Sequence, residues 1–176
     1  THANITTGLE ENKFGISMND MIDTIKLASS MANVNYRGLH FHSGSQVLEL
    51  SCFEMLAKRI NNIQDELEKA EIHNTEIINV GGGLGIDYDN PEDNPIPDFK
   101  GYFNAYKNNI KLRPGQSIHF ELGRALCGQC GQLICKCVYV KETSKKKFAI
   151  VDAGMTDLIR PALYDAHHKI VNLTGD

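Results

Sequence analysis

The chain has 176 residues, of which 41% are hydrophobic and 23% are charged, with 15 glycines, 5 prolines and no tryptophan. These proportions are typical of globular domains and exclude disorder and collagen-like repeats. No apolar run approaches the roughly 18 residues that a membrane-spanning helix needs, and the start lacks the pattern of a secretory signal, so we expect a cytoplasmic protein. The net charge of -4 provides no basic face, and we expect neither nucleic-acid nor membrane partners.

Hydrophobic spacing predicts alternating strands and helices from the start of the chain. The apolar stretch at 12–16 predicts a strand, and apolar residues at helical spacing predict a helix over 18–31. A second strand is expected over 34–41. An amphipathic helix follows, and Ser51 is expected to cap it, with Glu54 completing a capping box.

The next two strands flank a loop and a third helix. Residues 76–80 form an apolar strand that stops at three glycines, and a loop rich in Pro, Asp and Asn follows over 87–97. Asp98 is expected to cap the next helix, which ends before Pro114, and another strand is expected over 117–121. Four strand–helix units are therefore predicted, which favours parallel strands joined by right-handed crossovers.

Beyond Gly131 the pattern changes from alternation to strands alone. Two strand-like runs, 132–140 and 147–152, are joined by a lysine-rich turn without a long helix. We therefore expect two parts: residues 1–130 as part of a parallel α/β barrel, and residues 131–176 as the start of a β-rich domain.

Four cysteines lie close together near this boundary, as Cys127, Cys130, Cys135 and Cys137. A zinc site is one interpretation. However, only four residues separate the two pairs and the second pair is Cys-x-Cys, whereas structural zinc sites hold pairs further apart. Because the second pair also alternates with its neighbours as small apolar residues of a strand do, we expect no metal.

Three of the predicted strands end in residues that suit chemistry better than packing. His42-Ser43-Gly44-Ser45 follows the second strand, Gly81-Gly82-Gly83 follows the third, and Glu121-Leu122-Gly123-Arg124 ends the fourth. The carboxyl ends of barrel strands gather on one face, where barrel enzymes keep their active sites and glycine-rich turns hold phosphate groups. A hydroxyl, bare N–H groups, an imidazole, a carboxylate and a guanidinium together suit a phosphorylated aromatic cofactor.

Each motif alone also has a purely structural interpretation. A glycine triplet after a strand is often only a tight turn, and Ile86 stands where a dinucleotide-binding fingerprint needs glycine. His42 is compatible with a core histidine, and Glu121 and Arg124 are spaced like a local ion pair. The functional interpretation therefore depends on the convergence of the three motifs.

Residues 40–46, 79–85, 121–124 and 152–164 come in the order and spacing found in the diaminopimelate decarboxylases, which the chain resembles over its whole length. The last motif, which ends in Arg-Pro-Ala-Leu-Tyr, is the most specific, because other barrel-type amino acid decarboxylases share the histidine and glycine motifs but not this ending. The resemblance implies a pyridoxal-phosphate enzyme of lysine biosynthesis with a (β/α)8 barrel and a C-terminal β domain. Such an enzyme is a homodimer and converts meso-diaminopimelate into L-lysine and CO2.

The resemblance also implies roles for individual residues. His42 would stack on the cofactor ring, and Glu121 would contact the pyridine nitrogen and favour its protonated, electron-withdrawing form. Arginine binds carboxylates through a two-pronged donor set, which suits the second carboxylate of the substrate. The residues implied for the 5′-phosphate are Ser45, Gly81, Gly82, Gly83 and the backbone near Gly123, and those implied for the substrate's far carboxylate are Arg124, Arg160 and Tyr164.

Two positions depart from the family pattern. Ser43 stands where a bulky aliphatic residue is usual, and Leu122 replaces a proline. We expect Ser43 to leave a small void or an unpartnered hydroxyl beside the cofactor, and Leu122 to loosen a turn that proline would pre-set. The resemblance also places the Schiff-base lysine before Thr1 and a Cys-Glu-Ser motif after Asp176, so we expect no catalytic residue here and an inactive segment.

Three other interpretations stay open at this point. A related decarboxylase of arginine, ornithine or carboxynorspermidine would share most motifs, and a non-catalytic homologue would lack the nucleophile by nature. A self-contained doubly wound domain would use the glycine triplet as a ligand turn, but it leaves the β-rich end unexplained. The leading prediction is an internal segment of a diaminopimelate decarboxylase: the later part of a (β/α)8 barrel followed by the first strands of a C-terminal β domain.

Overall fold

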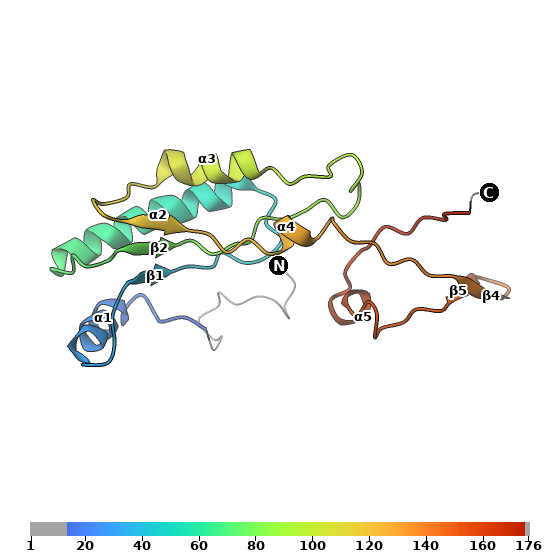
Figure 1. Cartoon of the computed structure of the whole chain (residues 1–176), viewed down its shortest axis with the longest axis horizontal. Helices are drawn as coiled ribbons and strands as arrows, with labels where there is room; N and C mark the ends of the chain where they lie inside the picture. The colour runs from blue at the N-terminus through green and yellow to red at the C-terminus, as the bar shows by residue number, and fades with distance from the viewer. Residues whose placement is uncertain (1–13, 175–176) are drawn as a thin grey trace. The chain divides into compact units, whose positions relative to one another are not determined.

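The computed structural model describes residues 14–174, which form two compact units. The first unit contains residues 14–86 and 96–128 and is an α/β structure (Figure 1). The second contains residues 87–95 and 129–174 and includes an antiparallel hairpin. Among the helices of these residues, none combines the length and apolar character that crossing a bilayer requires.

A three-stranded parallel sheet is the centre of the first unit. Its strands are β1 (Gly38–His40), β2 (Ile77–Asn79) and β3 (Ser117–His119), and they lie side by side in that order. The strands pair in register, residue for residue, from the first to the last position. Since the strands run the same way, their carboxyl ends lie level with one another at one edge of the sheet.

Helices pack on one face of this sheet. Helices α2 (Leu50–Lys69) and α3 (Phe99–Asn109) lie side by side along the strands, and α1 (Met21–Ser30) lies near β1 (Figure 1). Full burial of each large apolar side chain contributes about 1.5–3 kcal/mol, which makes this packing the main source of stability. The main core contains Phe53, Ala57, Ile60, Ile78, Val80, Leu84, Tyr102, Ala105, Tyr106 and Ala125, and a second cluster joins α1 to α2 through Met21, Ile25, Ile63, Leu67 and Ile72.

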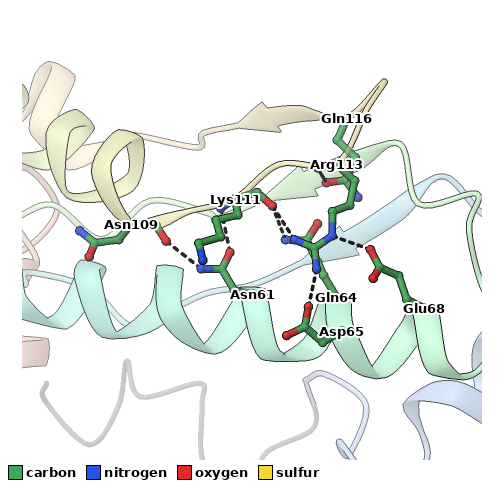
Figure 2. A network of polar contacts seen from close by, with 8 residues as sticks. All are labelled: Asn61, Gln64, Asp65, Glu68, Asn109, Lys111, Arg113 and Gln116. Atoms are coloured by element: carbon green, nitrogen blue, oxygen red, sulfur yellow. Dashed lines mark hydrogen bonds and ion pairs between the residues drawn. The ribbon is translucent and has the colours of Figure 1, made fainter.

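Arg113 fastens the segment between α3 and β3 to the side of α2 (Figure 2). Its Nε donates a hydrogen bond to Glu68 Oε1 at 2.6 Å, and its Nη2 bonds the carboxylate of Asp65. The two acids are three residues apart on α2, so they share one face of the helix. The hydrogen bond to Glu68 raises the pKa of Arg113, whose guanidinium therefore stays charged.

Two amide side chains extend the same contact toward the end of α3. Asn61 donates to the carbonyl oxygen of Asn109 and accepts from the backbone nitrogen of Lys111, both at 2.8 Å (Figure 2). The buried side chain of Gln64 donates to the carbonyl oxygen of Lys111 at 3.2 Å. These bonds use backbone groups that the end of α3 leaves unpaired, and they fix where β3 begins relative to α2.

The second unit contains β4 (Cys137–Glu142) and β5 (Lys147–Val151), which pair antiparallel and are exposed at every position. Helix α5 (Arg160–Tyr164) follows them. The loop over 87–95 lies against the end of the chain, where Lys169 pairs with Glu92.

The structure confirms the predicted helices and shortens the strands. The predicted helix over 18–31 is present as α1, and Asp98 caps α3 as predicted by accepting a hydrogen bond from the Gly101 nitrogen at 2.8 Å. The two predicted runs beyond Gly131 pair as a hairpin, although the first is displaced to 137–142.

Two predictions are wrong in detail. A strand was predicted over 12–16, but residues 14–16 form no strand, and residues 12 and 13 lie outside the described residues. The described parallel sheet therefore has three strands instead of four. Ser51 lies inside α2, and Glu49 takes the N-cap position without a side-chain bond. The helix begins earlier because Leu50, just before Ser51, packs against the main core.

We expect Arg113→Met to lower the free energy of unfolding by about 1–2 kcal/mol, because it leaves two carboxylates on α2 without their shared cation. Urea denaturation followed by circular dichroism measures the change. Arg37→Met is the matched control, since the Arg37–Glu76 pair is about half exposed and its loss should cost less than about 0.5 kcal/mol. Equal losses in both variants would contradict a bracing role for Arg113.

Candidate functional site

The loops after β1, β2 and β3 meet at the carboxyl edge of the sheet. The backbone nitrogen of Glu121 donates to the carbonyl oxygen of Gly81 at 2.8 Å, which joins the loops after β3 and β2. The backbone nitrogen of Val47 donates to the carbonyl oxygen of Gly83 at 2.9 Å, which joins the loops after β1 and β2. The three motifs singled out in the sequence therefore come together.

Close backbone contacts explain why the turn after β2 consists of glycine. Gly81 and Gly83 have φ values of 69° and 102°, which residues with a Cβ atom rarely adopt. A Cβ on Gly82 would overlap the carbonyl oxygen of Glu121, and one on Gly83 would overlap the carbonyl oxygen of Gly44. The triplet lets the neighbouring loops approach its backbone from both sides.

The glycine turn also presents two uncommitted donors. Within residues 14–174, the N–H groups of Gly82 and Gly83 donate to no protein acceptor. Gly82 is buried, and a buried N–H group without an acceptor is costly. Ser45 is half-buried in the adjoining loop and adds a hydroxyl. Successive free N–H groups of this kind form an anion-binding concavity.

Tyr102 supports the turn from the helix side. Tyr102 lies on α3, and its buried hydroxyl donates to the carbonyl oxygen of Gly81 at 3.5 Å. Burial raises the pKa of Tyr102 to about 12, so the hydroxyl keeps its proton at neutral pH.

The sheet has an apolar face and a polar face. The middle residue of each strand, and the residue two positions further on, are apolar and pack against the helices. The residues between them point to the opposite side, because side chains alternate along a strand. We call this opposite surface the polar face; it consists of His40, His42, Asn79, His119 and Glu121.

The carboxylate of Glu121 is held at both oxygens on this polar face. Asn79 Nδ2 donates to Glu121 Oε1 at 2.8 Å, and His40 Nε2 lies 3.2 Å from Oε2. Asn79 Oδ1 in turn accepts from the backbone nitrogen of Gly81 at 2.9 Å. The sequence motifs indicated no role for Asn79 or His40, although strand alternation places both on the same face as Glu121.

His42 is exposed beside the glycine turn. Its Nδ1 would lie 3.2 Å from a Cβ atom on Gly81, so the imidazole borders the turn closely. The candidate site thus has an imidazole beside a turn with two uncommitted N–H donors, and a carboxylate on the same polar face. Gly123 follows directly in the loop after β3.

Arg124 begins the short helix α4 (Arg124–Cys127) and reaches back to the loop after β1. Its Nη1 donates to Gln46 Oε1 at 3.1 Å. The amide of Gln46 also bonds both backbone groups of Ile86, at 2.6 and 3.2 Å. Gln46 has a φ of 60°, an uncommon value that these contacts stabilise. The sequence analysis assigned no role to Gln46. Its place at the end of the histidine motif, residues 40–46, was the one signal that could have indicated a role.

The other two predicted substrate residues lie in the second unit. Arg160 and Tyr164 are the first and last residues of α5, and the guanidinium carbon of Arg160 lies 5.4 Å from the centre of the Tyr164 ring. This distance is within the range of cation–π contacts, so the two side chains are neighbours.

The two departures from the family pattern have specific surroundings. Ser43 is exposed, so the side chain encloses no void within the described part of the chain. Leu122 is partly buried and packs against the main core, which anchors the turn in place of a rigid proline ring.

The four cysteines near residue 131 lie at the surface of the described residues. Cys127, Cys130, Cys135 and Cys137 are exposed and none is in a disulfide. No group of three or more potential ligands from His, Cys, Asp and Glu is assembled anywhere in residues 14–174. Cys137 is the first residue of β4, as the strand-like alternation predicted, and Cys135 precedes that strand; both side chains are exposed.

We expect Gly82→Ala to lower the free energy of unfolding by at least about 2 kcal/mol, because its Cβ would overlap backbone that cannot move away alone. Gly123→Ala is the matched control in the adjoining loop. Gly123 has a φ of -107°, and a Cβ added there would meet no atom within 4 Å, so its substitution should change stability by less than about 0.5 kcal/mol. Urea denaturation compares the two, and a Gly82→Ala variant as stable as Gly123→Ala would contradict the close approach.

Comparison with known proteins places these features in a family. Residues 1–128 match the family model described as pyridoxal-dependent decarboxylase, pyridoxal binding domain. The chain is 61% identical over 176 residues to the diaminopimelate decarboxylase of Bacteroides thetaiotaomicron, and 39% identical over 173 residues to that of Haemophilus influenzae. These alignments cover 100% and 98% of this chain but 45% and 41% of the two relatives, so the chain spans less than half their length.

Solved structures are similar as well. A mutant diaminopimelate decarboxylase from Helicobacter pylori, crystallised with L-lysine, superimposes with a TM-score of 0.84 at 34% identity, covering 96% of this chain and 41% of that one. The diaminopimelate decarboxylase of Methanocaldococcus jannaschii gives a TM-score of 0.77 at 36% identity, with 96% and 39% coverage. By its match to the family model over residues 1–128, the chain belongs to the pyridoxal-dependent decarboxylases and contains part of their pyridoxal-binding domain.

Proposed function

We propose that this chain forms the central part of a decarboxylase that converts meso-2,6-diaminopimelate into L-lysine and CO2 with the help of pyridoxal 5′-phosphate. The observation that carries the proposal is the 61% identity, over the whole chain, to a diaminopimelate decarboxylase. The grouping of the histidine, glycine and glutamate motifs at one edge of a parallel sheet supports it.

The architecture that we propose for the whole protein is a (β/α)8 barrel followed by a β domain. Residues 1–130 would supply the later part of the barrel, and 131–176 the first strands of the β domain. Support comes from β1 and β3, whose outer edges have no strand partner within residues 14–174, because further parallel strands on both sides would pair with them. The whole protein would act as a homodimer on a small amino acid substrate.

The residues at the carboxyl edge fit pyridoxal phosphate. Two free N–H groups at Gly82 and Gly83, with the Ser45 hydroxyl nearby, suit the three oxygens of a phosphate group. The exposed imidazole of His42 offers a flat surface for an aromatic ring. The Glu121 carboxylate lies on the same polar face, where it can hold a proton on a ring nitrogen.

When bound, pyridoxal phosphate supplies an electron sink for the negative charge left by the departing carboxylate. In this proposal His42 orients the ring, and the backbone near Gly123 joins Gly81, Gly82 and Gly83 around the phosphate. Glu121 keeps a proton on the pyridine nitrogen, which deepens the sink.

Specificity would come from side chains that recognise the second carboxylate of the substrate. Arg124, Arg160 and Tyr164 are the proposed set. The forked guanidinium of arginine matches a carboxylate, and the amide of Gln46 holds the Arg124 fork in a defined direction. A simple diamine precursor has no such carboxylate, so a site of this kind would favour diaminopimelate.

The full-length product of the gene that contains this chain tests the function. We expect it to release CO2 and L-lysine from meso-diaminopimelate, and to give no product from arginine, ornithine or carboxynorspermidine, as measured by chromatography. Turnover of one of these three instead would identify a related decarboxylase. No turnover of any of them, from a full-length protein that binds the cofactor, would favour a non-catalytic homologue.

A second prediction concerns the segment alone. Among residues 14–174, the lysines lie on helices, in the segment before β3 or beyond residue 130, so none belongs to the loops at the carboxyl edge where a nucleophile would act. Borohydride reduction of residues 1–176 mixed with pyridoxal phosphate should therefore leave no single lysine stoichiometrically modified, as mapped by mass spectrometry. Selective modification of one lysine would contradict the absence of the nucleophile. The full-length protein, reduced in parallel, is the positive control.

A further inference from the structure

We propose that Asn79 is a positioning residue that orients the Glu121 carboxylate and links it to the glycine turn, with His40 holding the second carboxylate oxygen. This inference rests on the proposed function, because the group that Glu121 would meet is the pyridine nitrogen of the cofactor. It concerns two residues that contact neither the ring nor the phosphate in the proposal above.

The amide of Asn79 uses both of its ends. Nδ2 donates to Glu121 Oε1 at 2.8 Å, while Oδ1 accepts from the backbone nitrogen of Gly81 at 2.9 Å. Rotation of the amide would break both bonds at once, so each bond keeps the other in place. Asn79 thereby connects the two parts of the site that would hold opposite ends of one cofactor.

An asparagine suits this position for a chemical reason. The side chain must accept from an N–H group and donate to a carboxylate, and a neutral amide does both. An ionised aspartate could accept from Gly81 but could not donate to Glu121. It would also place a second negative charge about one hydrogen-bond length from the first, and adjacent carboxylates share a proton instead of both ionising.

His40 completes the support of Glu121. Its Nε2 lies 3.2 Å from Oε2, the oxygen that Asn79 does not contact. With one partner for each oxygen, the plane of the carboxylate is fixed although its side chain is about half exposed. Because its partners already hold the Glu121 side chain before the cofactor binds, the side chain loses less rotamer entropy on binding.

His119 provides a matched control. It lies on the same polar face, opposite Asn79 in the strand register, but its imidazole Nε2 pairs with Ser117 Oγ at 3.2 Å. Replacing His119 therefore changes the polar face next to Asn79 but removes neither Asn79 nor His40, the two partners of Glu121.

The test compares Asn79→Ala, Asn79→Asp and His119→Gln in the full-length protein. A cofactor-free readout is hydrogen exchange at the Gly81 amide, which Asn79→Ala should accelerate at least tenfold and Asn79→Asp should leave slow. The second readout is the 15N chemical shift of pyridoxal phosphate labelled at the ring nitrogen, followed against pH. Asn79→Ala should lower the pH at which that nitrogen loses its proton by about one unit, because a less ordered Glu121 holds the pyridinium less well.

Asn79→Asp distinguishes positioning from simple packing, because it keeps the shape of the side chain. The aspartate can donate to Glu121 only while it carries a proton, so its 15N profile should match the unsubstituted protein at low pH and diverge as pH rises. His119→Gln should match the unsubstituted protein throughout.

The outcomes separate this inference from the proposed function. An unsubstituted protein that binds no pyridoxal phosphate would overturn both. A protein that binds the cofactor with a protonated ring nitrogen, and whose Asn79→Ala variant gives the same 15N profile, would overturn the positioning role and leave the proposed function intact. Slow exchange at Gly81 in Asn79→Ala would overturn the link to the glycine turn.

Discussion

The contact between the glycine turn and the loop after β3 is the constraint on which the site depends. The Gly81 carbonyl accepts from the Glu121 nitrogen at 2.8 Å, and the absence of a Cβ on Gly82 lets the Glu121 carbonyl lie against the turn. A side chain at this point would push the two loops apart. The carboxylate, the free N–H groups and the imidazole would then no longer share one surface, whatever the quality of the core beneath them.

The two faces of the sheet have separate tasks. Buried side chains of α2 and α3 stabilise one face, and Arg113 secures the start of β3 at the amino edge through two carboxylates on α2. Because the strands pair in register, fixing where β3 begins also fixes where Glu121 is placed beyond its end. Contacts at the amino edge of the sheet thus determine how far along the strand direction Glu121 lies relative to the glycine turn.

The convergence of the three motifs was predictable because strand and helix alternate, and parallel strands end together. The partners of Glu121 were not. Asn79 and His40 are the last residues of their strands. Assigning their contacts requires knowing which residue of each neighbouring strand lies level with them, and periodicity does not specify this. The Ser51 cap failed for a related reason: the capping-box pattern was present, but the burial of Leu50 extends the helix past it. Strand ends were overestimated because apolar runs continue into the core beyond the last paired residue.

The polar face makes almost no contribution to the apolar core, and this separation has an evolutionary consequence. Within residues 14–174, side chains such as His40 and His119 are exposed, so their replacement removes little of the surface that this unit buries by itself. Lineages that lose the need for the reaction can accumulate changes there while the chain still folds and persists in the cell. Conversely, new ligand preferences can arise on this surface without first requiring a more stable scaffold.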